Sequence, residues 1–185
     1  MRIIAGEKRG TKLYTLEGEN TRPTLDRVKE SLFNIIQSEI RDCIFLDLFS
    51  GSGAIGLEAV SRGAKKAILC DNNKQAIQII KKNIEKLGYK DKIELYQMQF
   101  NELINKLNEK IDIIYLDPPY KTNYAIKTVE LLLKKEILKT DSLIIIETDQ
   151  VEELKEKLEN LNIEIIDKRK YGRANLIFIQ QKTKK

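Results

Sequence analysis

Short, mostly apolar runs recur along the chain, and between them apolar residues return every three or four positions. The runs are typical of strands buried on both faces of a sheet, and the intervening spacing is typical of helices with one buried face. We expect strands at residues 43–46, 67–71, 93–96, 111–116 and 143–146, and helices at residues 75–87, 103–107, 129–133 and 151–161. This alternation predicts an α/β fold with a mostly parallel sheet.

Two further apolar runs follow the last of these helices, at residues 163–166 and 176–179. A turn at residues 171–173 joins them, and strands joined by so short a connection pair antiparallel. The chain therefore predicts a seven-stranded sheet with an antiparallel C-terminal strand.

The N-terminal residues predict a small β-hairpin, with strands at residues 2–5 and 11–16 on either side of a glycine-bounded turn. A polar loop follows, and Thr24 is the candidate N-cap of the next helix. We expect the chain to divide into an N-terminal β-hairpin extension at residues 1–20 and the α/β domain at residues 21–185.

A glycine-rich turn from Asp47 to Gly56 connects the first core strand to a helix. Gly51 and Gly53 let the backbone turn sharply near a ligand, and free N–H groups at the start of the helix suit a carboxylate or a phosphate. A dinucleotide-binding enzyme would show the same glycine spacing. Asp47 would repel a pyrophosphate but accept a hydrogen bond from an ammonium group, which favours S-adenosylmethionine over NAD. A tight turn without any ligand is the remaining alternative.

Three acids lie at the ends of predicted strands: Asp47, Asp71 and Asp117. Ligands of parallel sheets bind at the carboxyl ends of the strands, so these acids should converge on one cleft. Asp71 follows Gly53 at close to the interval of about 20 residues expected for an acid that binds ribose hydroxyls. Capping the next helix is the alternative role for Asp71.

The second motif consists of Asp117, Pro118, Pro119 and Tyr120. Two prolines remove two backbone donors and hold the chain extended, which points the Pro118 carbonyl into the cleft beside the Asp117 carboxylate. Two acceptors suit the hydrogens of an exocyclic amine on a planar base, and Tyr120 would stack on that base. The nitrogen lone pair could then attack a sulfonium methyl group in line. A plain Pro-Pro turn after a strand is the alternative.

Composition narrows the classes of function. The 185 residues are 42% hydrophobic and 33% charged, which is typical of a globular protein. The chain has no histidine, so histidine-based catalysis and most zinc sites are excluded and no metal is expected. Cys43 and Cys70 are expected to be buried thiols. No apolar run reaches the roughly 20 residues of a membrane span, and no signal peptide is recognisable, so we expect a cytoplasmic protein.

The formal charge is +5, and basic residues gather near the C-terminus. Basic segments attract phosphate backbones, which makes nucleic acid a candidate partner, although a solvated lysine tail would look the same. Residues 168–185 contain no acid and carry Lys168, Arg169, Lys170, Arg173, Lys182, Lys184 and Lys185.

The chain resembles the RsmD family of 16S ribosomal RNA guanine-N2 methyltransferases nearly end to end. The resemblance includes the glycine-rich turn from Asp47 to Gly56, the motif at residues 117–120, and the segments Arg22, Pro23, Thr24 and 26–34. The resemblance implies a Rossmann-like class I fold and S-adenosylmethionine as cofactor. It implies cofactor contacts from Asp47, Phe49, Ser50, Gly51, Ser52, Gly53, Asp71, Asn72, Gln99 and Phe100. It implies a catalytic segment of Asp117, Pro118, Pro119 and Tyr120. It implies RNA contacts from Lys8, Arg9, Lys12, Arg22, Thr24 and Arg27.

The implied partner is 16S ribosomal RNA or an assembling small-subunit particle, with the guanine turned out of its stack. A single small domain suggests a monomer. An adenine-N6 methyltransferase acting on DNA or RNA is the main alternative, because the same tetrapeptide serves both amines. A protein-glutamine methyltransferase and an RNA-binding module without catalysis are weaker ones.

Overall fold

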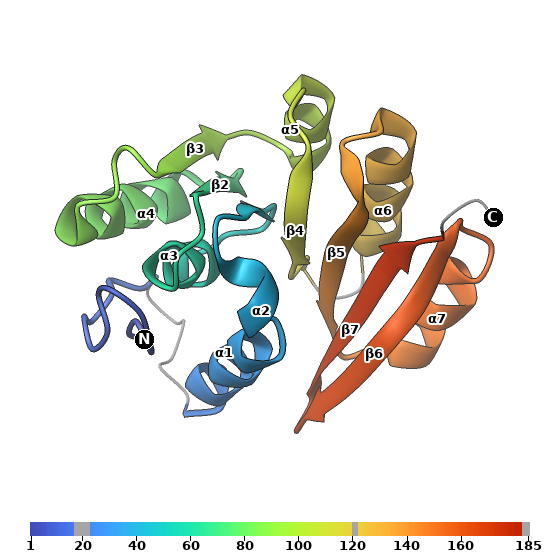
Figure 1. The fold of residues 1–185 in the computed structure, drawn as a ribbon, viewed down its shortest axis with the longest axis horizontal. Coiled ribbons are helices and arrows are strands. Elements are labelled where there is room, and N and C mark those ends of the chain that lie inside the picture. The colour runs from blue at the N-terminus through green and yellow to red at the C-terminus, as the bar shows by residue number, and fades with distance from the viewer. Residues whose placement is uncertain (17–22, 120–121, 183–185) are drawn as a thin grey trace.

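A computed structural model describes residues 1–16, 23–119 and 122–182, and within them seven strands form one sheet in the order β3-β2-β1-β4-β5-β7-β6 (Figure 1). The strands are β1 (Ile44–Asp47), β2 (Lys66–Asp71), β3 (Ile93–Gln97), β4 (Ile111–Leu116), β5 (Leu138–Thr148), β6 (Ile163–Tyr171) and β7 (Ala174–Gln181). The helices are α1 (Pro23–Ile35), α2 (Gln37–Ile40), α3 (Ala54–Ser61), α4 (Lys74–Leu87), α5 (Phe100–Lys106), α6 (Tyr124–Lys135) and α7 (Val151–Leu158).

Strand directions confirm the predicted fold class. The pairs β1–β2, β1–β4, β2–β3 and β4–β5 are parallel, and β7 runs antiparallel to both β5 and β6. β6 forms one edge of the sheet, and a shift in its pairing with β7 falls between Ile165 and Asp167.

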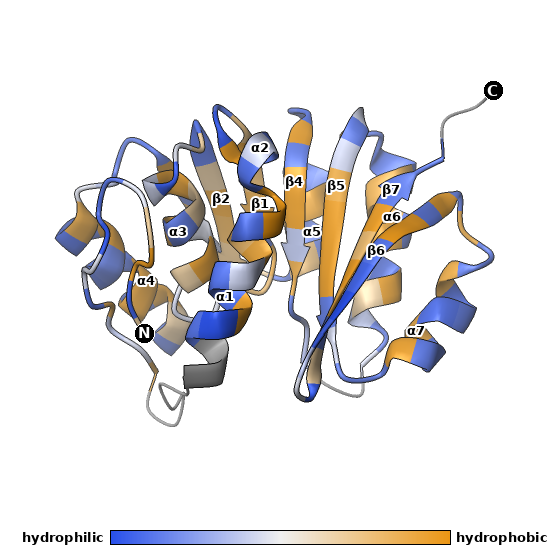
Figure 2. Ribbon diagram, turned by 60° about the horizontal axis from the view of Figure 1, so that its bottom comes forward, coloured by the Kyte–Doolittle hydropathy of each residue, from blue (hydrophilic) through white to orange (hydrophobic). Residues whose placement is uncertain are grey.

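Helices cover both faces of the sheet and create two cores. Apolar residues of α1, α3 and α4 pack on one face, and those of α5, α6 and α7 pack on the other. Successive residues of a strand enter opposite cores, since side chains alternate along a strand. Phe45 of β1 thus belongs to the first core and Leu46 to the second. Figure 2 shows hydrophobic residues concentrated along the strands and polar residues on the outer helix faces.

Helix starts follow local chemistry that the apolar spacing does not reveal. α1 begins at Pro23, a residue favoured at the first helical position, so Thr24 lies inside the first turn and the predicted N-cap is wrong. α5 begins at Phe100 rather than near residue 103, because the side chains of Gln99 and Glu102 form a capping box. α6 begins at Tyr124, well before the predicted residue 129.

The predicted N-terminal hairpin is short: one antiparallel bridge joins Arg2 to Lys12, and no longer strand is present within residues 1–16. The Ile3 N–H donates to the Thr11 carbonyl of the facing arm at 2.9 Å. The backbone N–H groups of Ile4 and Ala5 donate to the Glu58 carboxylate of α3 at 2.8 and 3.0 Å. Ile3 and Leu13 are buried in the first core, and the division at residue 20 remains a prediction.

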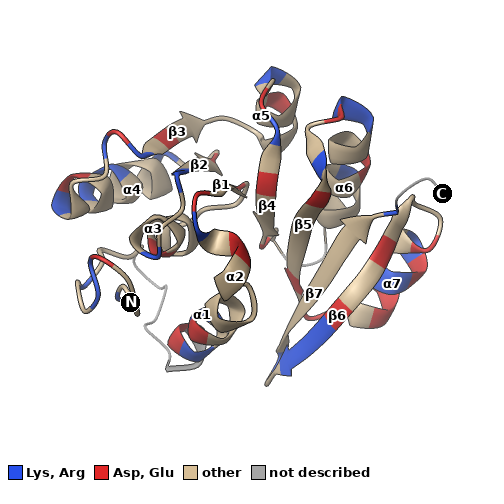
Figure 3. Cartoon of the chain, viewed as in Figure 1, with Lys and Arg blue, Asp and Glu red and all other residues tan. Residues whose placement is uncertain are grey.

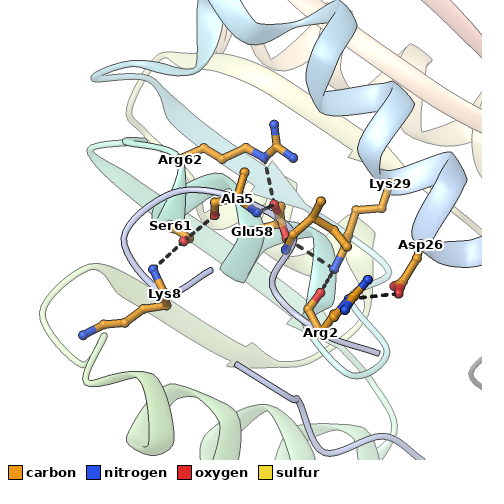
Figure 4. A network of polar contacts seen from close by, with 9 residues as sticks. Arg2, Ala5, Lys8, Asp26, Lys29, Glu58, Ser61 and Arg62 are labelled. Atoms are coloured by element: carbon orange, nitrogen blue, oxygen red, sulfur yellow. Dashed lines mark hydrogen bonds and ion pairs between the residues drawn. The ribbon is translucent and has the colours of Figure 1, made fainter. Parts of the chain in front are cut away.

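Glu58 is the centre of a buried polar network that joins the N-terminal segment to α3 and α1 (Figure 4). Its carboxylate is fully buried, accepts from Arg62 Nε at 2.8 Å and lies 3.3 Å from Lys29 Nζ. The Lys29 ammonium also donates to the Arg2 carbonyl. Burial lowers the pKa of Lys29, and the Glu58 charge opposes this shift.

Gly6 is where the N-terminal segment approaches α3 most closely. Its φ is +84°, and a Cβ built there would lie 1.8 Å from the Ser61 carbonyl oxygen. Gly10 has nearly the same φ, +85°, but a Cβ there would meet nothing within 4 Å. The two glycines therefore share backbone strain and differ only in crowding.

We expect Gly6→Ala to reduce the free energy of unfolding by about 1–3 kcal/mol more than Gly10→Ala, because the extra methyl group forces backbone apart. Urea unfolding of both variants measures the difference. Equal losses would mean that the close approach to Ser61 contributes nothing beyond the strain of a positive φ.

Candidate active site

A cleft of about 1010 Å³ opens at the carboxyl ends of the parallel strands. The three strand-end acids Asp47, Asp71 and Asp117 all line it, as the strand order led us to expect. Nine more residues singled out from the sequence line it as well: Phe49, Ser50, Gly51, Ser52, Asn72, Gln99, Phe100, Pro118 and Pro119. Gly53 is not among the lining residues. It precedes α3 with a φ of +80° and turns the chain into the helix.

Asp47 is buried at the floor of this cleft, with 1% of its surface exposed. Among the described residues nothing hydrogen-bonds its Oδ1 atom. Burial raises the pKa of Asp47 to about 7, the backbone N–H of Phe49 acts in the opposite direction, and the charge of Asp71 adds to the rise. Buried polar atoms without partners are rare, so this oxygen is suited to a ligand that donates hydrogen bonds or carries positive charge.

Asp71 holds the glycine-rich turn in place. Its Oδ2 accepts from the Gly51 N–H at 2.9 Å, and its Oδ1 accepts from the Asn73 N–H at 2.8 Å. The cap of α4 is Asn73, whose side chain accepts from the backbone of Gln75 and Ala76, so the alternative role of Asp71 as a helix cap is wrong. Each carboxylate oxygen has two lone pairs, and Asp71 can still accept from a ligand.

Three aromatic rings stand together at one side of the cleft. Phe49 and Tyr124 are stacked with centroids 6.3 Å apart, and Phe100 lies 5.3 Å from Phe49 and 5.1 Å from Tyr124. Such a cluster offers an apolar surface for a planar ring. Sequence reasoning missed Tyr124, because the start of α6 was placed after it.

The segment that follows β4 lines the cleft through Asp117, Pro118 and Pro119, with Asp117 exposed. The Thr122 hydroxyl donates to the Pro119 carbonyl at 2.8 Å. Tyr120 lies outside the described residues, so its predicted stacking role stays a prediction.

Two cleft residues were not predicted and form a pair. The Tyr115 hydroxyl, buried on β4, donates to Oε2 of Glu147 on β5. Burial raises the pKa of both groups. Glu147 could have been found by the rule that located Asp71, since it follows directly on the apolar run 143–146. The cleft also contains Asp149 and the turn 171–174 between β6 and β7.

The residues expected to contact RNA lie outside this cleft where the structure describes them. Arg9, Lys12 and Arg27 are exposed, and Lys8 Nζ lies 3.3 Å from Glu7. Figure 3 shows basic residues on the N-terminal loop, on α1 and along β6. Arg22 and the side chain of Thr24 fall outside the described residues.

Residues 1–16, 23–119 and 122–182 contain no cluster of three or more Cys, Asp or Glu side chains arranged to hold a metal ion. None of the helices in the same ranges is long and apolar enough to cross a membrane.

Comparison with known proteins identifies relatives over most of the chain. A family model described as "Conserved hypothetical protein 95" matches residues 1–180. Ribosomal RNA small subunit methyltransferase D of Haemophilus influenzae is 39% identical over 153 residues, covering 81% of this chain and 79% of that protein. The protein of the same name from Escherichia coli K12 is 36% identical over 151 residues, covering 80% and 75%. A solved Escherichia coli structure named as a methyltransferase superposes with a TM-score of 0.83 at 28% identity, covering 100% and 99%.

Proposed function

The chain belongs to the RsmD family of ribosomal RNA small subunit methyltransferases, and we propose that it transfers a methyl group from S-adenosylmethionine to the N2 amine of a guanine in 16S ribosomal RNA. One observation supports this most directly. The buried Asp47 oxygen without a partner lies in the same cleft as Asp117 and Pro118. The proposed site for a cation and the proposed site for an amine therefore open onto one cleft.

The residues present fit S-adenosylmethionine. The Asp47 carboxylate would accept from the ammonium of the methionine part, and Asp71 would accept from the ribose hydroxyls. Phe49, Phe100 and Tyr124 offer the apolar surface that an adenine ring requires. When bound, the cofactor supplies an electrophilic methyl group on a sulfonium. The cleft volume of about 1010 Å³ lies at the upper end of the usual range for ligand sites, which leaves room for a base as well.

Toward the target guanine, the protein's proposed role is to hold the N2 amine in position. Asp117 and the Pro118 carbonyl would accept the two amine hydrogens, which fixes the nitrogen and directs its lone pair at the methyl group. Transfer needs no covalent attachment to the protein, in agreement with a chain that has no histidine.

Cofactor affinity should depend on pH through Asp47. Its pKa of about 7 belongs to the free protein, and a bound ammonium group favours the ionised carboxylate. Binding below pH 7 must therefore displace a proton. We expect the Kd, measured by calorimetry, to weaken by about tenfold per pH unit between pH 7 and 5. In Asp47→Asn the affinity should be lower and nearly flat over the same range. A flat profile in the unmodified protein would argue against an ammonium at Asp47.

Basic residues of the N-terminal segment are proposed to contact RNA phosphates. Replacing Lys8, Arg9 and Lys12 by Ala should reduce the slope of log K against log salt by about 2–3, because each lost contact removes about 0.7–0.9. The control is the double variant of Lys155 and Lys157 on α7, at the other end of the sheet. Equal slopes in both variants would assign the three residues to a solvated surface.

The proposed function is tested with radiolabelled S-adenosylmethionine and small ribosomal subunits from a strain that lacks the protein. The RNA is digested to nucleosides and the labelled product identified. Label in N2-methylguanosine is the expected result. Label in N6-methyladenosine would keep the cleft chemistry and overturn the base assignment. No labelled nucleoside would overturn RNA methylation as the function.

A further inference from the structure

Guanine and adenine differ in the group beside the reactive amine. The N2 amine of guanine is next to N1–H, a hydrogen-bond donor, whereas the N6 amine of adenine is next to an unprotonated N1, an acceptor. An amine-binding segment such as Asp117–Pro118 accepts from either amine. The protein atom that faces the neighbouring ring position therefore decides which base is held correctly.

Glu147 is placed next to the amine-binding segment by strand register. β4 and β5 are parallel neighbours in which Tyr115 pairs with Ile145 and Leu116 pairs with Ile146. β4 ends at Leu116, and continuing its register by one residue would set Asp117 beside Glu147, with both side chains on the same side of the sheet. Both residues line the cleft.

Tyr115 gives the Glu147 carboxylate a fixed orientation. Tyr115 lies two residues before Asp117, and its buried hydroxyl donates to Oε2 of Glu147. Because the Tyr115 hydroxyl donates its hydrogen, the Glu147 carboxylate is the acceptor in this hydrogen bond. Across the described residues, this is the one hydrogen bond that the structure records for the Glu147 side chain, so the carboxylate retains capacity for a ligand.

We propose, on the basis of the proposed function, that Glu147 accepts the N1–H of the target guanine while Asp117 and Pro118 hold its N2 amine, and that this contact selects guanine over adenine. With adenine in the same position, the carboxylate would oppose the N1 lone pair, and neither acceptor would have a donor. The donated N–H also favours the ionised carboxylate, against the effect of burial on the pKa of Glu147.

Asp149 does not fill this role equally well. It also lines the cleft, but it lies beyond the end of β5 and is exposed, whereas Glu147 is half-buried within the strand. An exposed carboxylate is solvated and discriminates weakly between partners. Asp149→Asn is therefore a matched control, since it removes a cleft carboxylate of the same charge two residues away.

The test uses 2-aminopurine, which keeps the N2 amine but has an unprotonated N1 and no O6. Small-subunit RNA is ligated with guanine or 2-aminopurine at the methylated position, and kcat/KM is measured for both. The ratio of the two values within one protein preparation does not depend on the fraction of active enzyme. We expect the unmodified protein to prefer guanine, and Glu147→Gln to reduce that preference by about tenfold or more, because its amide can donate to N1.

Asp149→Asn should keep the preference of the unmodified protein. An unchanged ratio in Glu147→Gln, with guanine N2 methylated by the unmodified protein, would overturn the role of Glu147 and leave the proposed function intact. Absence of N2 methylation by the unmodified protein would instead overturn the proposed function. If Glu147→Gln turns over neither RNA, the ratio of the two binding affinities gives the same comparison without catalysis.

Discussion

Asp117→Ala is expected to lower the rate of methyl transfer by about 10²–10⁴-fold, the usual range for loss of a group that positions and polarises a reacting atom. Asp117 stands at the end of β4, is exposed to the cleft, and lies in the same cleft as Asp47. Without its carboxylate one amine hydrogen loses its acceptor, and the nitrogen is no longer held for in-line attack. Single-turnover kinetics with labelled cofactor measure the change.

RNA affinity and cofactor affinity should remain within about twofold in this variant, because Asp117 contributes to neither the phosphate contacts nor the ammonium site. Asp117→Asn is the control, since its amide oxygen still accepts one hydrogen bond, and it should keep more activity than the Ala variant. Full activity in Asp117→Ala would refute the assigned mechanism.

Glu58→Gln is expected to reduce the free energy of unfolding by about 3–5 kcal/mol, as seen when one member of a buried ion pair is removed. The shape of the side chain is retained, but Lys29, 2% exposed, loses its counter-charge. The new amide also presents N–H groups where the backbone of Ile4 and Ala5 donates. The loss should appear as a lower urea midpoint.

An exposed glutamate of α4, Glu85, provides the control, and Glu85→Gln should change the free energy of unfolding by less than about 0.5 kcal/mol. Equal midpoints for the two variants would mean that Lys29 is neutral or is solvated in the folded protein.

Buried strands and their carboxyl ends could be predicted from the sequence because both depend on local patterns. The runs that contain Phe45, Leu69 and Ile114 are apolar on both faces, and an acid directly after such a run must lie at the edge of the sheet. Asp47, Asp71 and Asp117 were found in this way. Glu147 satisfies the same rule, but its pairing with Tyr115 depends on the register of β4 and β5, which single-strand patterns do not contain.

The errors concern the bounds of elements, which depend on contacts outside the local pattern. The N-terminal segment has the composition of a hairpin, but its pairing is limited to one bridge, and the Ala5 N–H donates to Glu58, more than fifty positions later. Tyr124 was missed because the helix was predicted only over residues 129–133, whereas α6 begins at Tyr124. Similarly, β5 begins at Leu138 because Leu138 pairs with Ile111, although Lys139, Thr140 and Asp141 do not look like a buried strand.

The edge strand β6 has a further consequence for the solubility of the protein. In the part of the chain that the structure describes, no strand pairs with its outer side. Ile165 and Ile166 are 39% and 47% exposed, so another copy could add to the sheet there. Two features oppose such growth. The pairing of β6 with β7 is irregular between Ile165 and Asp167, which disrupts a regular edge. The run from Lys168 to Lys170 would also bring basic side chains together in an antiparallel pair of copies, even though Lys168 and Arg169 form ion pairs within one chain. We therefore expect association of copies through the edge of β6 to be disfavoured.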